Sequence, residues 1–141
     1  MPILASALTS HLTASARDIL VEAESFARLG GWVVDQQSMP AMGSPYLLAH
    51  GLGVAVEDAV TTVDIQREGH YRIWVRTRDW AARWSRQGSP GRFKVAVNGQ
   101  PLSTLFGTEG DEWHWQDGGT VTLHRGGNEL RLHDLTGFDG R

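Results

Sequence analysis

The feature that most constrains the fold is a strictly alternating stretch in the middle of the chain, between Gly69 and Trp80. Successive side chains of a β-strand point to opposite faces, so alternation with β-branched and aromatic residues predicts a strand. We interpret one face as core and the other as either arginines stacked around a tryptophan or a surface that faces a ligand. The first face holds Tyr71, Ile73, Val75 and Thr77, and the second holds Arg72, Trp74, Arg76 and Arg78.

Short alternating or apolar runs, separated by glycine-containing turns, occupy most of the remaining chain. Gly69 marks a turn, so we expect the central strand to return from a strand at 59–65, and Asn98-Gly99 is a strong hairpin signal. The other predicted strands lie at 18–26, 32–35, 46–50, 93–97, 101–106, 112–116, 120–124 and 129–135. This pattern predicts an all-β fold, an antiparallel β-sandwich of the jelly-roll, galactose-binding-like type. Residues 1–17 are expected to form an N-terminal arm, disordered or a short helix, before a single domain at 18–141.

Composition argues against several classes of function. The formal charge of −3 and the pI near 6.0 argue against nucleic acid as the main partner. No apolar run approaches the roughly 20 residues that span a bilayer, so we expect no membrane association. Cysteine is absent, which removes disulfides and thiolate chemistry. No lysine or arginine precedes Arg17, so the charged start of a signal peptide is not seen. The sequence leaves the location unknown, and of the alternatives we favour an extracellular or periplasmic bacterial one.

The six tryptophans indicate either a very aromatic core or a surface that stacks on flat ligands. Trp80 and Trp84 fall on a predicted loop, where sheet alternation does not explain them. Trp113 and Trp115 share one face of a predicted strand, with His114 on the other face. Loops on a rigid scaffold hold many binding residues, so these tryptophans are candidates for ligand contact.

Two carboxylates, Glu22 and Glu24, lie two residues apart in the first predicted strand and therefore emerge on one face. Like charges at this spacing repel, and a cation between them would remove the repulsion. Calcium prefers oxygen ligands of this kind. An exposed pair near a sheet edge explains the same spacing without a metal.

No recognised catalytic motif accompanies these features. The histidines and acids that could converge in a cleft show no metal-ligand spacing, and there is no Gly-x-Ser-x-Gly elbow. The candidates are His50, His114, His133, Asp134 and Asp139. The sequence gives an enzyme no positive support.

Four segments occur along the chain in a recognisable order: Glu22-Ala23-Glu24, then GHYRIWVR at 69–76, FKVAVNG at 93–99 and GNELRL at 127–132. Together they resemble the calcium-containing β-sandwich carbohydrate-binding modules of families six and thirty-five, over residues 19–135. The resemblance implies a structural calcium at Glu22 and Glu24. It also implies a later aspartate ligand, for which the chain offers Asp139 or Asp134. Sugar sites in these modules lie in the loops at one end of the sandwich or on its concave face.

The segments at 42–51 and 132–141 are similar to an accessory domain fused to bacterial FAD-dependent oxidoreductases. That second resemblance implies a domain fused to, or associated with, a catalytic domain. We find no flavin site in the sequence.

Our leading hypothesis is a non-catalytic carbohydrate-binding domain for a polysaccharide or oligosaccharide, including acidic ones, because guanidinium groups pair well with carboxylates. The tryptophans named above would stack on sugar rings, while Arg78, Asp79, His114 and Gln116 would hydrogen-bond hydroxyls. One alternative is a small glycan-active hydrolase or lyase that uses His, Asp or Glu. Another is a structural accessory domain whose tryptophans form a domain or subunit interface.

Overall fold

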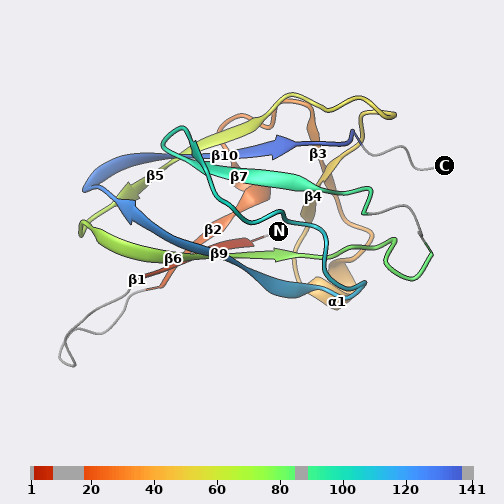
Figure 1. Cartoon of the computed structure of the whole chain (residues 1–141), viewed down its shortest axis with the longest axis horizontal. Helices are drawn as coiled ribbons and strands as arrows, with labels where there is room; N and C mark the ends of the chain where they lie inside the picture. Colours follow the sequence, from red (N-terminus) through yellow and green to blue (C-terminus); the bar gives the residue numbers. More distant parts are fainter. Residues whose placement is uncertain (1, 8–17, 85–88, 138–141) are drawn as a thin grey trace.

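The structure is a computed structural model of the chain, and it describes residues 2–7, 18–84 and 89–137. Two four-stranded antiparallel sheets face each other (Figure 1). The first sheet has the order β2 (Asp18–Glu22), β1 (Pro2–Ala7), β6 (Gly69–Thr77) and β9 (His114–Leu123). The second has the order β5 (Ala59–Ile65), β10 (Gly126–Asp134), β7 (Phe93–Val97) and β8 (Gln100–Pro101). The predicted all-β antiparallel sandwich is therefore confirmed.

The core lies between the two sheets and is built from their alternating inward side chains. On β6, Tyr71, Ile73, Val75 and Thr77 are all buried, which confirms the core face predicted from the alternation. Phe106, which is fully buried, stacks on Phe93 of the second sheet at a ring-centroid distance of 5.6 Å. The fold is held by the burial of this apolar layer, as in other β-sandwiches.

The chain begins with a strand rather than with the expected arm. Within the described residues, β1 pairs with β2 on one side and with β6 on the other, so it lies inside the first sheet. Ile3 on this strand is buried in the core. The alanine- and serine-rich composition at 1–17 gives no local signal for a strand. The strand is instead specified by pairing with β6, which lies some 70 residues away in the sequence. The rest of the predicted arm, residues 8–17, lies outside the described residues.

Two predicted connections are wrong. The strand at 59–65 does not form a hairpin with β6, because β5 pairs with β10 while β6 pairs with β1 and β9, so the chain crosses between sheets at 66–68. The Tyr71 hydroxyl donates to the Arg67 carbonyl at 2.6 Å and fixes this crossing. The predicted turn at Asp117-Gly118-Gly119 is a β-bulge inside one continuous strand, β9. Gly118 packs under Phe106, where an added Cβ would lie 3.0 Å from the ring.

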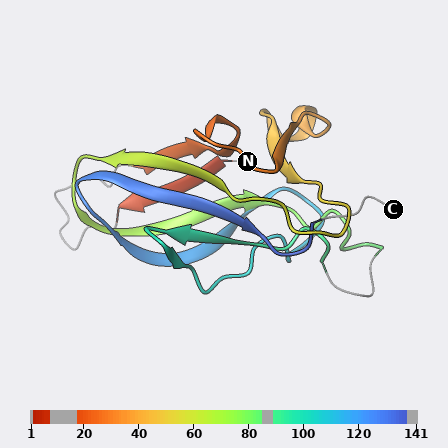
Figure 2. The same ribbon diagram turned by 90° about the horizontal axis from the view of Figure 1, so that it is seen from above.

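A third, two-stranded sheet stands beside the sandwich (Figure 2). It consists of β3 (Trp32–Asp35) and β4 (Tyr46–Ala49), joined through a short helix, α1 (Met39–Met42). We refer to residues 32–49 as the hairpin. It follows η1 (Ala23–Ser25), a 3-10 turn where a continued strand was predicted.

The base of the hairpin is fixed by backbone contacts to the segment that leads into β5. Gly31 N–H donates to the Glu57 carbonyl at 3.0 Å. Gly30 has φ +57°, and an added Cβ would lie 2.2 Å from the Asp58 carbonyl oxygen, so only glycine fits there. None of the helices in the described ranges has the length and hydrophobicity to cross a lipid bilayer.

Candidate functional site

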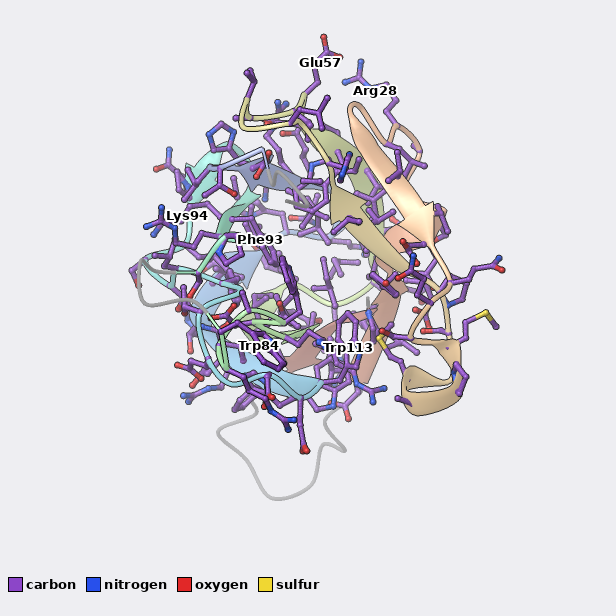
Figure 3. All side chains as sticks on the ribbon, turned by 90° about the vertical axis from the view of Figure 1, so that its right-hand side faces the viewer. Arg28, Glu57, Trp84, Phe93, Lys94 and Trp113 are labelled. Atoms are coloured by element: carbon purple, nitrogen blue, oxygen red, sulfur yellow. The ribbon has the colours of Figure 1, made fainter. Side chains whose placement is uncertain are left out.

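A cleft of about 750 Å³ lies between the hairpin and the end of the sandwich. Its walls come from both strands of the hairpin, from the segment that follows β6 and from the residues that precede β9. Figure 3 looks onto this end of the molecule, with Phe93 and Trp113 labelled. The lining comprises Trp32, Val33, Asp35, Gln37, Ser38, Tyr46, Leu47, Leu48, Ala49, His50, Thr77, Arg78, Trp80, Gly91, Phe93, Trp113 and Asp134.

Five aromatic residues line the cleft, and four of them pack against one another in pairs. Tyr46 of the hairpin lies 5.1 Å from Trp113, centroid to centroid, with the rings tilted by 59°. Trp32 meets Phe93 edge-on at 5.7 Å and 82°. The Arg78 guanidinium carbon lies 6.0 Å from the centre of the Trp113 ring. These contacts connect the hairpin to the sandwich across the cleft and combine aromatic surface with one cation.

Three polar donors of the cleft lining are buried without a hydrogen-bond partner. They are the indole Nε1 of Trp32, the indole Nε1 of Trp113 and the Nε of Arg78. A buried donor without an acceptor costs on the order of 1–3 kcal/mol, and native structures contain few of them. All three atoms belong to residues that line one cleft, which makes this cleft the candidate place where a bound molecule, or water, supplies acceptors.

The two carboxylates of the lining are already occupied by donors of the protein. Asp35 accepts the Gln37 N–H at 2.7 Å. It also hydrogen-bonds Tyr46, and burial together with this bond raises the pKa of the Tyr46 hydroxyl. Asp134, which is 2% exposed, accepts N–H groups from Val56 at 2.9 Å, Gly137 at 2.8 Å and Thr136 at 3.1 Å. Asp134 therefore organises the surrounding backbone, and the geometry gives it no free oxygen for acid–base chemistry.

Three of the candidate ligand-binding residues taken from the sequence meet in the cleft, and two of the residues considered for catalysis, His50 and Asp134, line it as well. Arg78, Trp80 and Trp113 all line it, and Trp80 is 37% exposed. They come from two segments, one after β6 and one before β9, which the pairing of β6 with β9 brings together.

The remaining tryptophan candidates lie outside the lining. Trp84, 80% exposed, sits on the turn that follows Trp80 (Figure 3). Trp115, which is 41% exposed, lies opposite Arg76 on the outer face of the first sheet. It is therefore on a different surface from Trp113, which lines the cleft.

The polar candidates Asp79, His114 and Gln116 also lie outside the lining and hold loops in place. Asp79 is buried and accepts the Ser89 hydroxyl at 2.7 Å and the Ala81 N–H at 3.2 Å. Gln116 is buried and bonds the Leu105 carbonyl at 2.9 Å. The Nδ1 of His114 lies 2.9 Å from the Glu112 carbonyl oxygen, and its Nε2 has no hydrogen-bond partner.

Sequence reasoning missed the hairpin wall. Trp32 and Tyr46 supply an unpartnered donor and a ring, yet each was assigned only to a short strand. The available signal was the aromatic residue directly after Gly30-Gly31. Paired glycines allow one backbone segment to approach another closely, and here they let the start of the hairpin pack against residues 56–58.

The arginine row on the outer face of β6 is mostly engaged within the protein. Arg72 pairs with Asp117 through two oxygens and lies 5.4 Å from the centre of the Trp74 ring. The hydrogen bond from Arg72 lowers the pKa of the Asp117 carboxyl. Arg76 donates to the Met42 carbonyl at 3.1 Å. The stacking interpretation thus describes Arg72 and Trp74, and Arg78 at the end of the row is the one that enters the cleft lining.

Glu22 and Glu24 lie together at the end of β2 and in η1. Burial, and then the negative charge of Glu24, raise the pKa of Glu22, and one Glu22 oxygen is buried without a hydrogen-bond partner. An acceptor oxygen of this kind fits a cation. Among the described residues, however, no third His, Cys, Asp or Glu joins them as a metal-binding group. Asp139 lies outside the described residues.

No family model matches the sequence, and no curated protein matches it. Solved structures do match the fold. A GH26-CBM35 β-(1,4)-mannanase from Podospora anserina has a TM-score of 0.60 at 21% identity, over 82% of this chain and 24% of the mannanase.

Two further matches are single modules. A family 35 carbohydrate-binding module from Clostridium thermocellum has a TM-score of 0.59 at 21% identity, over 85% of this chain and 87% of the module. A family 35 module from an environmental isolate has a TM-score of 0.53 at 18% identity, over 79% and 81%. The fold is that of family 35 carbohydrate-binding modules. At these identities the likeness carries the fold alone, so the function rests on the site.

Proposed function

We propose that this protein is a non-catalytic carbohydrate-binding domain and that the cleft is its sugar site. The observation that carries the proposal is the set of three unpartnered donors, Trp32 Nε1, Trp113 Nε1 and Arg78 Nε, in an aromatic-lined cleft. Sugars present many oxygen acceptors on a ring whose apolar face packs on aromatic side chains. The likeness of the fold to carbohydrate-binding modules is consistent with this proposal.

We further propose that an acidic sugar is preferred, with its carboxylate on Arg78. A guanidinium forms short, charge-assisted hydrogen bonds with carboxylates. Asp35 and Asp134 also line the cleft, and their charge opposes an anion. Backbone N–H groups already occupy both of them, however, whereas the Nε of Arg78 still lacks an acceptor. Affinity at a single site should be on the order of 10 µM to 1 mM, since few groups are desolvated with a large net gain.

The same proposal includes two further parts. A calcium ion binds at Glu22 and Glu24, and the domain is fused to, or associates with, a catalytic domain. Calcium is supported by the unpartnered oxygen of Glu22 and the neighbouring Glu24. Work beside a catalytic domain is supported by the mannanase match, a protein in which a module of this fold accompanies a GH26 β-(1,4)-mannanase.

The test is binding of the purified protein to neutral and acidic polysaccharides in affinity gels, followed by calorimetry with the best oligosaccharide. Trp80→Ala should weaken binding about tenfold, because a stacking surface is lost. Arg78→Gln should weaken acidic ligands about tenfold and neutral ones little.

Trp84→Ala and Trp115→Ala are the matched controls, since both remove an exposed tryptophan outside the cleft. Loss of binding in Trp115→Ala with full binding in Trp80→Ala would move the site to the outer face of the first sheet. Absence of binding to every glycan would overturn the carbohydrate proposal.

A further inference from the structure

We infer that Arg76, which lies outside the cleft, is a positioning residue that sets the place of the hairpin wall and thereby the width of the site. The part of the inference that concerns ligand affinity rests on the proposed function. Its structural part, that Arg76 holds the hairpin, can be measured without ligand.

The contact joins the outer face of the first sheet to the end of α1. Arg76 Nη1 donates to the Met42 carbonyl at 3.1 Å across 34 residues of sequence. Met42 is the last residue of α1, followed by Gly43 at φ +81°. The last carbonyls of a helix have no partner inside the helix, and a cation placed there satisfies one of them and is favoured by the helix dipole.

The helix α1 at the tip of the hairpin is mostly exposed. Met42 is 6% exposed, whereas Met39 is 39% exposed and Pro40 and Ala41 are exposed as well. Since α1 has four residues, it is far too short to be stable by itself. The hydrogen bond from Arg76 to the Met42 carbonyl therefore ties α1 to β6 of the first sheet.

The residues next to α1 form the far wall of the cleft. Gln37 and Ser38 precede the helix and line the cleft, and Tyr46 follows it and packs on Trp113. The distance of this wall from Arg78 and Trp113 therefore depends on where α1 sits. A ligand that needs both walls sees a lower affinity in proportion to the fraction of molecules in which the hairpin is in place.

The experiment compares Arg76→Ala, Arg76→Lys and the control Arg72→Ala. Arg72 lies on the same face of the same strand, but its guanidinium pairs with Asp117 of β9. Hydrogen exchange is measured on the ligand-free proteins at Gly43, whose N–H donates to the Met39 carbonyl at 2.8 Å, and along the β3–β4 ladder. Calorimetry with an oligogalacturonate follows, as the probe for an acidic sugar.

In Arg76→Ala we expect hairpin amides to exchange about tenfold faster and oligogalacturonate to bind about tenfold more weakly, with the β6–β9 amides unchanged. Arg76→Lys should recover most of both losses, because an ammonium can also donate to the Met42 carbonyl. Arg72→Ala should change neither quantity.

Unchanged hairpin exchange in Arg76→Ala would overturn the inference, as would equal acceleration in Arg72→Ala. If hairpin exchange changes as expected but the unmodified protein binds no glycan, the carbohydrate proposal fails and the positioning of the cleft by Arg76 stands.

Discussion

Replacement of Asp134 by alanine should be among the most destabilising single substitutions in this domain. The carboxylate is 2% exposed and accepts three backbone N–H groups, from Val56, Thr136 and Gly137. It therefore ties the segment before β5 to the turn that follows β10. Alanine leaves all three donors without their anionic acceptor.

The magnitude follows from the burial of those donors. A hydrogen bond to a charged group contributes about 1.5–3 kcal/mol, and a buried donor left unpaired costs about 1–3 kcal/mol. Gly137 is buried, whereas Val56 and Thr136 are half-buried and can regain water. We therefore expect a loss of about 3–5 kcal/mol, a large part of the roughly 5–15 kcal/mol that stabilises a typical domain.

Urea unfolding followed by tryptophan fluorescence measures the free energy of unfolding directly, and Asp64→Ala on the exposed side of β5 serves as the control. The hydrogen-exchange rates of the Val56 and Gly137 amides should rise in Asp134→Ala by more than the exchange rates of the amides in the first sheet. A loss below about 1 kcal/mol would refute the reasoning, because an ordinary point substitution destabilises a protein by that amount. The same result would reopen a chemical role for the carboxylate.

Two further predictions concern the carboxylate pair and a glycine. Because burial and Glu24 raise the pKa of Glu22, the contribution of Glu22 to the stability of the metal-free protein should be fully present below the ordinary glutamate pKa and should be lost as pH rises through the raised pKa. Thermal unfolding from about pH 4 to 7 should show this loss, and calcium should reverse it. Glu22→Gln should abolish both the pH effect and the calcium effect. A calcium response retained in Glu22→Gln would place the ion elsewhere. Gly30→Ala should cost about 2 kcal/mol or more because its Cβ would meet the Asp58 carbonyl oxygen at 2.2 Å, whereas Gly99→Ala, at φ +80° with nothing within 4 Å, should cost about 1 kcal/mol. Equal losses in these two variants, measured by urea unfolding, would show that crowding at Gly30 is relieved by movement of the loop.

Local pattern was enough to predict the fold class, because alternation and turn chemistry are encoded within a few residues. The strand at 69–77, its buried face and the Asn98-Gly99 turn, where both residues have positive φ, are of this kind. Pairing partners are not encoded locally. For that reason the crossing at 66–68 looked like a hairpin, and β1 looked like an arm.

The site was predictable only in part for the same reason. Arg78, Trp80 and Trp113 stood out because bulky residues near loop positions are unusual. Asp79 illustrates the ambiguity of local pattern, because an aspartate at the start of a loop is as useful for bonding the loop's own N–H groups, as it does here, as for bonding a ligand. The contributions of Trp32 and Tyr46 depend on where the hairpin folds over the sandwich, which is a property of the tertiary structure.

The position of β1 inside the first sheet has a consequence for how the chain folds. Ile3 pairs with Val75, so β1 gains its second neighbour only after β6 has been synthesised. Contacts this distant in sequence are closed late and slow the folding of β-proteins. A domain trimmed to residues 18–141 would lose a strand paired on both sides and leave the edges of β2 and β6 open to other chains. Recombinant versions of this domain should therefore begin before Pro2, with any affinity tag attached through a flexible linker.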